Sequence, residues 1–387
     1  MTPAHYTTDD CDLDAFIALV AQVTDPGDYP YAAGVEKGII VYDTARLRPL
    51  LDDDVQRRAV MAELATAIHD GPGVVVLAGA FDDEQAVDAV TDAFRRIIAA
   101  EKQAGTAPGD HFAEAGANDR VWNALEKLAV EDPAAFARYY SNDMLALVSE
   151  AWLGPRYQVT SQVNQVNPGG KAQSPHRDYH LGFQSRESAE VYPAQAHHMS
   201  AALTLQGAVA HCDMPLESGP TLLLPHSQKY APGYIAWHLP EFQDHARRRF
   251  VQLALKKGDA VFFNPALFHA AGENVSTDIQ RLANLLQVSS AFGRAMETID
   301  RERVVNAIYP ALLEMKRRGA SPETLGHAIA ASAEGYAFPT NLDRDQPKGS
   351  DAPPAQSDLV SRALDEEWEP ERLAKELSDY GTTRLSH

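Results

Sequence analysis

The sequence predicts an α+β protein in which a β-rich core is flanked by helices at both ends. Short apolar or alternating segments separated by turn signals dominate residues 157–290. Helical spacing of apolar residues dominates the segments before and after them. Many short strands with little helix between them are typical of an antiparallel barrel or a double-sheet jelly roll. We therefore expect one such core between two helical extensions.

The N-terminal part is predicted to combine helices with two strands. Residues 38–42 form an apolar, β-branched run, and residues 73–79 form another that is bracketed by glycines, as expected of strands. Residues 52–69 repeat apolar side chains at helical spacing. Residues 82–102 have acidic residues early and basic residues late, which favours an amphipathic helix. A Gly-, Ala- and Asp-rich loop is expected at 105–119, followed by helices over 120–153.

Turn signals at 168–170, 217–220 and 257–259 divide the central region. The strands expected there are residues 157–167, 199–209, 221–224, 250–255, 260–263 and 282–290. Helices are expected again at 298–318, 322–331 and 370–377, with a mobile loop at 343–358. The domain organisation predicted is a helical extension at 1–70, a core at 71–295 and a helical C-terminal extension at 296–387.

Composition restricts the class of partner. The 387 residues carry 54 acidic against 34 basic side chains, a formal net charge of −20. Such a surface repels nucleic acid and anionic membranes, so we expect neither as a partner. Cys11 and Cys212 have neither disulfide nor metal-ligand spacing. With no signal peptide and no apolar run long enough to span a bilayer, we expect a cytoplasmic protein whose partner is a small molecule. The oligomeric state stays open.

The most informative motif is His176-Arg177-Asp178, followed some ninety residues later by Phe268-His269. Residues two apart on a strand point to the same side, so His176 and Asp178 can share a barrel interior. If His269 lies across from them, two imidazoles and a carboxylate occupy one face of a metal ion. That ligand set suits iron(II) and leaves the opposite face open for a chelating cosubstrate and dioxygen.

His-x-Asp alone is a weak signal, because the chain contains a second copy, His211-Cys212-Asp213. A rival metal site of His211, Asp213 and His226 is therefore left open. The same three ligands at 176, 178 and 269 also suit a non-redox metal-binding β-barrel enzyme, such as an isomerase or a hydrolase. A barrel that serves only as a binding scaffold is the third alternative.

The order of motifs resembles the phytanoyl-CoA dioxygenase family of iron(II)- and 2-oxoglutarate-dependent oxygenases. The resemblance covers residues 70–292 and rests on the set of segments rather than on any one. These segments are the Gly-Val-Val-Val-Leu-Ala-Gly-Ala-Phe run at 73–81, His176-Arg177-Asp178, residues 217–229, Lys257-Gly258-Asp259 with the strand after it, His269, and Asn274-Val275-Ser276 through Arg281.

This resemblance implies a double-stranded β-helix, a jelly-roll or cupin-like core, with His176, Asp178 and His269 on iron(II). It implies that Arg281 binds the distal carboxylate of 2-oxoglutarate, for which a guanidinium fork is suited. The expected activity is hydroxylation of an unactivated C–H bond of a small molecule, with O2 consumed and succinate and CO2 released. Because related halogenases lack the carboxylate ligand, Asp178 favours hydroxylation, with desaturation as the lesser alternative.

Further residues are expected around this centre. Gln158, Thr160, Gln162 and Asn164 alternate along one strand and so share one face, from which we predict Gln162 and Asn164 as cosubstrate ligands, together with Thr221. The predicted substrate contacts are Tyr179, His180, Phe183 and Trp237.

Two departures from the family pattern limit which residue roles the resemblance implies for this chain. Gln228 stands where the family has a histidine, and Ala271 stands where a hydroxyl often holds the cosubstrate, a role that Ser276 could take.

Overall fold

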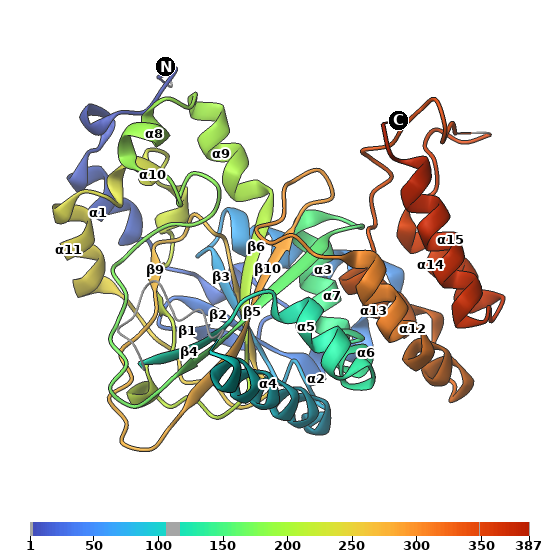
Figure 1. Ribbon diagram of the computed structural model, residues 1–387. Coiled ribbons are helices and arrows are strands. Elements are labelled where there is room, and N and C mark those ends of the chain that lie inside the picture. The colour runs from blue at the N-terminus through green and yellow to red at the C-terminus, as the bar shows by residue number, and fades with distance from the viewer. Residues whose placement is uncertain (1–2, 106–116, 348, 387) are drawn as a thin grey trace.

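An eight-stranded mixed sheet forms the centre of the molecule (Figure 1). The computed structural model of the protein describes residues 3–105, 117–347 and 349–386. In spatial order the strands are β1 (Gly34–Glu36), β2 (Ile39–Asp43), β3 (Val74–Ala78), β8 (Ala260–Phe263), β6 (Thr204–Ala210), β10 (Arg281–Ser289), β5 (Gln158–Val166) and β4 (Asn118–Val121). Strands β2 and β3 are parallel, and the other neighbouring pairs are antiparallel.

A second, two-stranded sheet of β7 (Leu222–Leu223) and β9 (His269–Ala270) completes the core. An apolar cluster fills the space between the sheets, with Val74 and Val261 from the large sheet and Leu223 from the small one. Isolated bridges, including His176↔His269, extend the small sheet. Two facing, largely antiparallel layers with helices around them confirm the predicted α+β class with a double-stranded β-helix.

Helices surround this core. Their bounds are α1 (Leu13–Val20), α2 (Thr44–Leu47), α3 (Asp54–His69), α4 (Glu84–Ala104), α5 (Ala124–Glu131), α6 (Pro133–Tyr140), α7 (Asp143–Leu153), α8 (Arg186–Glu190), α9 (Ala194–Ala202), α10 (Gly233–Ala236), α11 (Pro240–Arg249), α12 (Arg301–Arg317), α13 (Pro322–Ser332), α14 (Gln356–Asp365) and α15 (Pro370–Thr383).

Strand β10 shows how the two faces of the large sheet differ. Leu282, Leu286 and Val288 belong to the largest apolar cluster, which the surrounding helices complete. The alternate residues, among them Arg281 and Gln287, line a cavity on the other face. This period-two pattern places the polar side chains inside the β-helix and the apolar ones beneath the helices.

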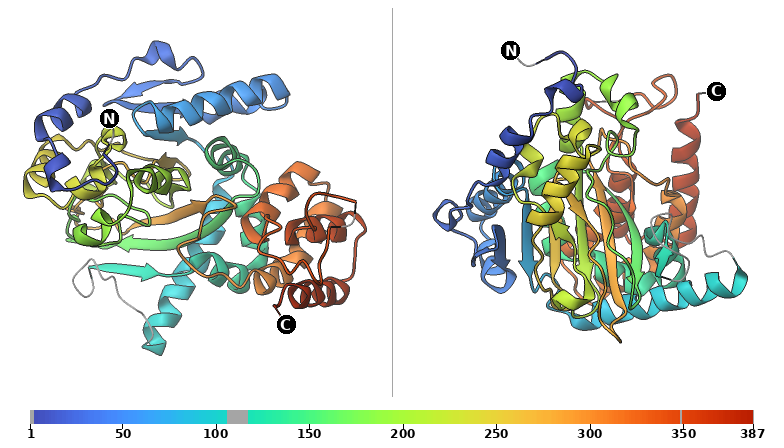
Figure 2. Two further views of the ribbon diagram at one scale, coloured as in Figure 1. Left: turned by 90° about the horizontal axis from the view of Figure 1, so that it is seen from above. Right: turned by 90° about the vertical axis from the view of Figure 1, so that its left-hand side faces the viewer.

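The two ends of the chain cover opposite sides of the core. Helix α1 packs with α11 through Phe16 and Phe242, and this cluster includes Phe268 beside the ligand candidate His269. Helices α12 to α15 lie on the other side of the sheet, as Figure 2 shows. Strands β1 and β2, from the segment before residue 71, belong to the large sheet itself.

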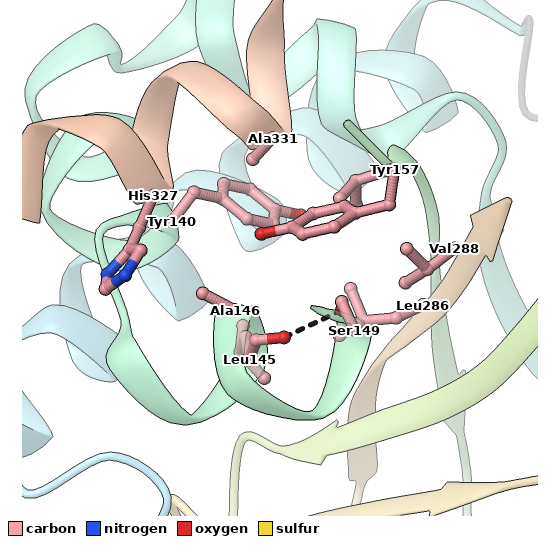
Figure 3. Close-up of a pocket in the computed structure, with 10 residues that line it drawn as sticks. Tyr140, Leu145, Ala146, Ser149, Tyr157, Leu286, Val288, His327 and Ala331 are labelled. Carbon is pink, nitrogen blue, oxygen red and sulfur yellow. Dashed lines mark hydrogen bonds between the residues drawn. The ribbon is translucent and has the colours of Figure 1, made fainter. Parts of the chain in front are cut away.

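Helix α13 joins the core with almost no space left over. The gap between α13, α7 and the strands β5 and β10 has a volume of about 10 Å³. Tyr140, Tyr157 and Val288 border it, and the Ser149 hydroxyl next to it donates to the Leu145 carbonyl (Figure 3). A space of this size holds one water at most, so this region is packing and not a ligand site.

Several sequence-based boundaries were wrong. Residues 199–202 continue helix α9, since an apolar, Ala-rich run does not by itself distinguish helix from strand. Residues 250–255 form only isolated bridges. Residues 118–121 are the edge strand β4, where a loop running into a helix was expected. Residues 356–358 open α14 instead of ending a loop. The rest of the predicted 105–119 loop falls largely on residues 106–116, outside the described residues.

Within the residues that the structure describes, no helix combines the length and the apolar character needed to cross a bilayer.

Candidate metal centre

Two short backbone segments bring His176, Asp178 and His269 together. His176 and His269 exchange backbone hydrogen bonds of 3.0 Å in both directions, and the Asp178 amide donates to the Pro265 carbonyl at 3.0 Å. Residues directly opposite on antiparallel segments project to the same side, and Asp178 follows two residues later on that side. The candidate ligand atoms of the three side chains all lie within 4.8 Å of one another. The structure thus brings together the three side chains that the sequence singled out as metal ligands.

Backbone carbonyls orient both imidazoles. The Nδ1 atom of His176 lies 2.8 Å from the Ser174 carbonyl, and Nδ1 of His269 lies 2.9 Å from the Leu267 carbonyl. A carbonyl only accepts, so each Nδ1 carries the hydrogen and each Nε2 keeps its lone pair. Histidine ligands in proteins are commonly fixed in this way through the nitrogen remote from the metal.

The Asp178 carboxylate is kept ionised. Burial alone would raise its pKa, but the neighbouring imidazoles of His269 and His176 and a hydrogen bond from Gln206 together lower the pKa. Gln206 Nε2 lies 2.6 Å from Asp178 Oδ2, and His269 Nε2 lies 3.5 Å from the same oxygen. Burial, with His269 nearby, lowers the pKa of His176. An anionic carboxylate beside two imidazoles is the donor set that a divalent iron requires.

The three ligands open into a cavity of about 690 Å³. Its size is typical of small-molecule sites and exceeds what one keto acid needs. Part of its wall is apolar, and Phe263, which packs against His269, Leu285, Phe183, Trp237 and Met296 contribute to it. The cavity therefore has room for a cosubstrate and a second small molecule beside the metal ligands.

Arg281 lies in the wall of the same cavity at the start of β10. Its residue is 6% exposed, and burial lowers its pKa to about 10. Within the described residues its guanidinium has neither an ion-pair partner nor a side-chain hydrogen bond. A buried cation without a counter-charge is costly, and a carboxylate entering the cavity would supply the missing partner.

Polar residues predicted from the strand pattern also face this cavity. Gln162, Asn164 and Thr221 all line it. Asn164 is the register partner of Ala283 and Gln162 that of Leu285, so both occupy the face that carries Arg281. Gln162 Nε2 and Asn164 Oδ1 are buried and have no partner among the described atoms. Gln162 Oε1 accepts a hydrogen bond from Arg120 on the edge strand β4.

The four residues predicted as substrate contacts separate into two pairs. Phe183 and Trp237 line the cavity. Tyr179 is turned away from it: its hydroxyl donates to the Arg294 carbonyl at 2.6 Å and lies 3.2 Å from Ser289 Oγ. His180 packs against the Tyr179 ring and is not part of the cavity wall.

The rival metal site does not form. His211 lies in the core with Nδ1 2.8 Å from Thr91 Oγ1 and Nε2 3.0 Å from Tyr139 Oη, so both of its nitrogens are engaged. His226 instead contacts Thr24 and Lys229. Within the described residues, His176, Asp178 and His269 are the one group of three or more such side chains close enough to share a metal.

The two departures from the family pattern have structural roles here. Gln228 donates to the Gly71 carbonyl at 3.0 Å and so fastens its turn to the loop before β3. The Ser276 hydroxyl donates to Asn274 Oδ1 at 2.6 Å within its own turn and does not line the cavity. The cosubstrate role suggested for Ser276 is therefore not supported by its position.

Sequence reasoning missed the pair Gln206 and Gln287 and the buried role of Arg177. Each glutamine is a buried amide next to apolar residues of its strand, which is the signal that could have identified it. Arg177 is 2% exposed; it donates to the Ser227 carbonyl, and its guanidinium lies over the rings of Tyr234 and Phe268. Tyr234 donates to the Asp178 carbonyl, and Phe268 directly precedes His269. Through these two rings Arg177 contacts both segments that carry the candidate ligands.

The double-stranded β-helix and the buried histidine–aspartate cluster are those of iron(II)- and 2-oxoglutarate-dependent enzymes. The family model of the phytanoyl-CoA dioxygenases matches residues 70–282, and the chain belongs to that family. Iron(II), 2-oxoglutarate and dioxygen are the cofactors of the class, as predicted. A comparison with the curated proteins gives no match.

Solved structures with a similar fold include three enzymes described as alpha-ketoglutarate-dependent or crystallised with 2-oxoglutarate. The epimerase SnoN from nogalamycin biosynthesis is 23% identical over 60% of this chain and 83% of its own, with a TM-score of 0.41. The carbocyclase SnoK from the same biosynthesis is 18% identical over 59% and 83%, with a TM-score of 0.43. HygX from Streptomyces hygroscopicus, solved with nickel and 2-oxoglutarate, is 15% identical over 61% and 90%, with a TM-score of 0.40. No residue role is taken from similarities at this level.

Proposed function

We propose that the protein is an iron(II)- and 2-oxoglutarate-dependent dioxygenase that hydroxylates an unactivated C–H bond of a small molecule. The observation that carries the proposal is Arg281, a buried guanidinium that has no partner among the described residues and lies in the same cavity as His176, Asp178 and His269. A metal centre alone does not need this cation. A metal centre that works with a dicarboxylic keto acid does, because the second carboxylate has to be neutralised away from water.

The residues present fit the metal. Two imidazoles whose Nδ1 atoms face backbone carbonyls, and one ionised carboxylate, would supply three ligands and leave the remaining positions open. When bound there, iron(II) supplies the activation of dioxygen, in the overall reaction of substrate, O2 and 2-oxoglutarate to alcohol, succinate and CO2. The protein contributes ligation, orientation and exclusion of water.

Each remaining residue has an assigned part in this proposal. Arg281 binds the distal carboxylate of the cosubstrate through its fork. Asn164, Gln162 and Thr221, which line the same cavity, hydrogen-bond the cosubstrate between Arg281 and the metal. Asp178 would be a metal ligand where a halogenase would need the position for a halide, which favours hydroxylation over halogenation. Phe183 and Trp237, which also line the cavity, flank the substrate.

The test combines a spectrum with product formation. Anaerobic addition of iron(II) and 2-oxoglutarate should give a weak visible charge-transfer band, and admission of oxygen should release succinate even without a substrate. Arg281→Ala should lose both at cosubstrate concentrations that saturate the wild type, while Arg247→Ala on the outer helix α11 should retain both. Full succinate formation by Arg281→Ala would show that the cosubstrate lies elsewhere.

The same experiment addresses the non-redox alternative. An isomerase or hydrolase built on these three ligands would bind a metal but would give no band with 2-oxoglutarate and no succinate. It would also leave Arg281 without a function.

A further inference from the structure

Arg177 stands between two of the candidate metal ligands, and its side chain is among the largest that the protein encloses fully. Arg177 borders the cavity, but its guanidinium lies among three residues that do not, Ser227, Tyr234 and Phe268. Within the described residues, no carboxylate forms an ion pair with it. A buried cation without a counter-charge is costly, so the contacts that it makes need an explanation.

Three contacts hold this guanidinium in place. Its Nη2 atom donates to the Ser227 carbonyl, and its Cζ atom lies 5.3 Å from the ring centroid of Tyr234 and 5.1 Å from that of Phe268. Aromatic rings attract a cation over their faces, and the attraction is strongest where water is excluded. A planar guanidinium can meet ring faces and a carbonyl acceptor at the same time, which the compact ammonium of a lysine does less well.

The contacted residues are themselves bonded to the segments that carry the ligands. Tyr234 Oη donates to the Asp178 carbonyl at 2.8 Å. The Phe268 amide, directly before the third ligand, donates to Ser227 Oγ at 2.8 Å. The guanidinium therefore completes a chain of contacts between the two ligand-bearing segments, through residues that do not line the cavity.

Gly233, the first residue of α10, leaves the space that the guanidinium fills. A Cβ atom added at this position would overlap Cζ and both terminal nitrogens of Arg177. Because Gly233 directly precedes Tyr234, a larger residue here would displace either the guanidinium or the start of this short helix. The backbone of α10 and the side chain of Arg177 are thus fitted to each other.

We propose that Arg177 is a positioning residue for the metal centre, whose guanidinium fixes how the ligand-bearing segments 176–178 and 268–269 are turned relative to each other. Backbone hydrogen bonds of 3.0 Å pair these segments, but a two-stranded pair this short is marginal by itself and can twist. The contacts of the guanidinium oppose that twist. The inference rests on the function proposed above, because it assumes that the two segments hold a divalent metal.

A cobalt(II) titration tests this role without turnover. Cobalt(II) replaces iron(II), and its visible absorption responds to the arrangement of the ligands. Arg177→Met removes the guanidinium and keeps an unbranched side chain. We expect the affinity for cobalt(II) to fall about tenfold, as is usual when a group that orients metal ligands is lost, and the visible bands to change. An affinity within twofold of the wild type together with the wild-type spectrum would overturn the inference.

Arg301→Met is the matched control. Arg301 is also a buried arginine, 9% exposed, and it donates to the carbonyls of Val159, Ala331 and Ser332, none of which lines the cavity. This variant should keep the cobalt(II) affinity within twofold and the wild-type spectrum, even where its Tm falls. A loss of affinity equal to that of Arg177→Met would show that the effect belongs to any buried arginine, which would contradict the proposed role.

Gly233→Ala displaces the guanidinium while Arg177 stays in place, so it tests the proposal even if Arg177→Met does not fold. It should weaken cobalt(II) binding about fivefold to tenfold. Gly326→Ala on α13, where an added Cβ meets no atom within 4 Å, should leave it within twofold. Wild-type affinity in Gly233→Ala would count against the inference.

A double-mutant cycle shows whether the two sites act through the same contact. A methionine at position 177 ends before the atoms that a Cβ at position 233 would overlap. In the Arg177→Met background, Gly233→Ala should therefore weaken cobalt(II) binding less than twofold further. Fully additive losses would mean that Gly233 acts independently of the guanidinium, and the proposal would fail.

The wild-type protein separates this inference from the function on which it rests. If the wild type binds cobalt(II) and gives the charge-transfer band with iron(II) and 2-oxoglutarate, but Arg177→Met and Gly233→Ala match it, only the positioning role is wrong. If the wild type binds no divalent metal, the oxygenase function is wrong and the role of Arg177 falls with it.

Discussion

The chain contains two His-x-Asp sequences, and the structure gives them opposite uses. His176 and Asp178 meet His269 at the edge of a large cavity. His211 is enclosed by Thr91 and Tyr139, and Asp213 accepts the backbone amide of Lys257 at 3.0 Å. The difference lies in how many ring nitrogens of each histidine are already hydrogen-bonded. Each histidine of the first site uses only Nδ1 for a backbone carbonyl, whereas His211 uses both ring nitrogens for side chains of the core. A histidine can bind a metal only where the fold leaves one nitrogen for it.

The largest effect expected from this comparison is on metal affinity. Asp178→Ala removes the one anionic ligand and should lower the affinity for iron(II) or its substitute zinc(II) by more than about 100-fold. Asp213→Ala, the matched change in the second motif, should leave it within twofold. Calorimetric metal titration of both variants measures the difference, and comparable losses in the two would mean that the second motif also binds metal.

Arg281 provides the next test, because this buried cation lies in the cavity beside the first motif and not beside the second. Arg281→Leu should weaken 2-oxoglutarate binding about 100-fold, as expected when charge-assisted hydrogen bonds to a carboxylate are lost. The protein without cosubstrate should not be destabilised, because the leucine replaces a buried charge that has no counter-ion. Thermal unfolding with and without 2-oxoglutarate checks both statements. A cosubstrate-induced rise in Tm that survives in the variant would contradict the assignment of Arg281.

The neighbouring residues Gln206 and Gln287 allow a finer test at the first motif, because only Gln206 is hydrogen-bonded to Asp178. Gln206→Leu should lower metal affinity about tenfold, because it removes the hydrogen bond that holds Asp178 Oδ2. Gln287→Leu is the matched control and should leave metal affinity within twofold, since Gln287 makes no hydrogen bond with Asp178. Metal titration of the pair tests this, and identical affinities would show that Gln206 does not position the carboxylate.

The smallest effect concerns His211 and the pH dependence of stability. Burial lowers the pKa of His211 to about 3, below its ordinary value of 6.5. Between these two values the unfolded chain binds the proton and the folded chain does not, so folding becomes less favourable as the pH falls through this range. The limiting slope for one such group is about 1.4 kcal/mol per pH unit. Urea unfolding of the wild type between pH 7 and pH 5 should show a steeper loss of stability than His211→Phe, and parallel pH profiles would contradict this role.

Sequence patterns predicted much of this site because the relevant signals are local. His176 and Asp178 are two residues apart, and Gln162 and Asn164 alternate along one strand, so their common direction follows from strand geometry. The β-helix strands at 158–166, 260–263 and 281–289 also had clear patterns with turn residues beside them. The meeting of His269 with the first two ligands was inferred from the order of motifs, and the structure places them together.

The rest depended on register and on tertiary context. Gln206 and Gln287 are 81 positions apart, and only the pairing of β6 with β10 makes them neighbours. Tyr179 follows Asp178 directly, yet adjacent residues on an extended segment point in opposite directions, and its ring turns toward Ser289. The segment 199–202 became helical because Ala and Ser permit a helix as readily as a strand, and packing then decides.

Strand β10 contributes both Arg281 and Gln287 to the wall of the cavity. Arg281 and Gln287 are six residues apart on one face, a span of about 20 Å at the rise of a β-strand. The distance between these two side chains along the cavity wall is therefore set by the number of residues between them on one strand. A one-residue insertion between these positions would not lengthen the reach by a few ångströms; it would turn one of the two side chains over to the helix-covered face. Homologues that handle larger or smaller molecules should accordingly vary in the loops around the cavity and keep the length of this strand.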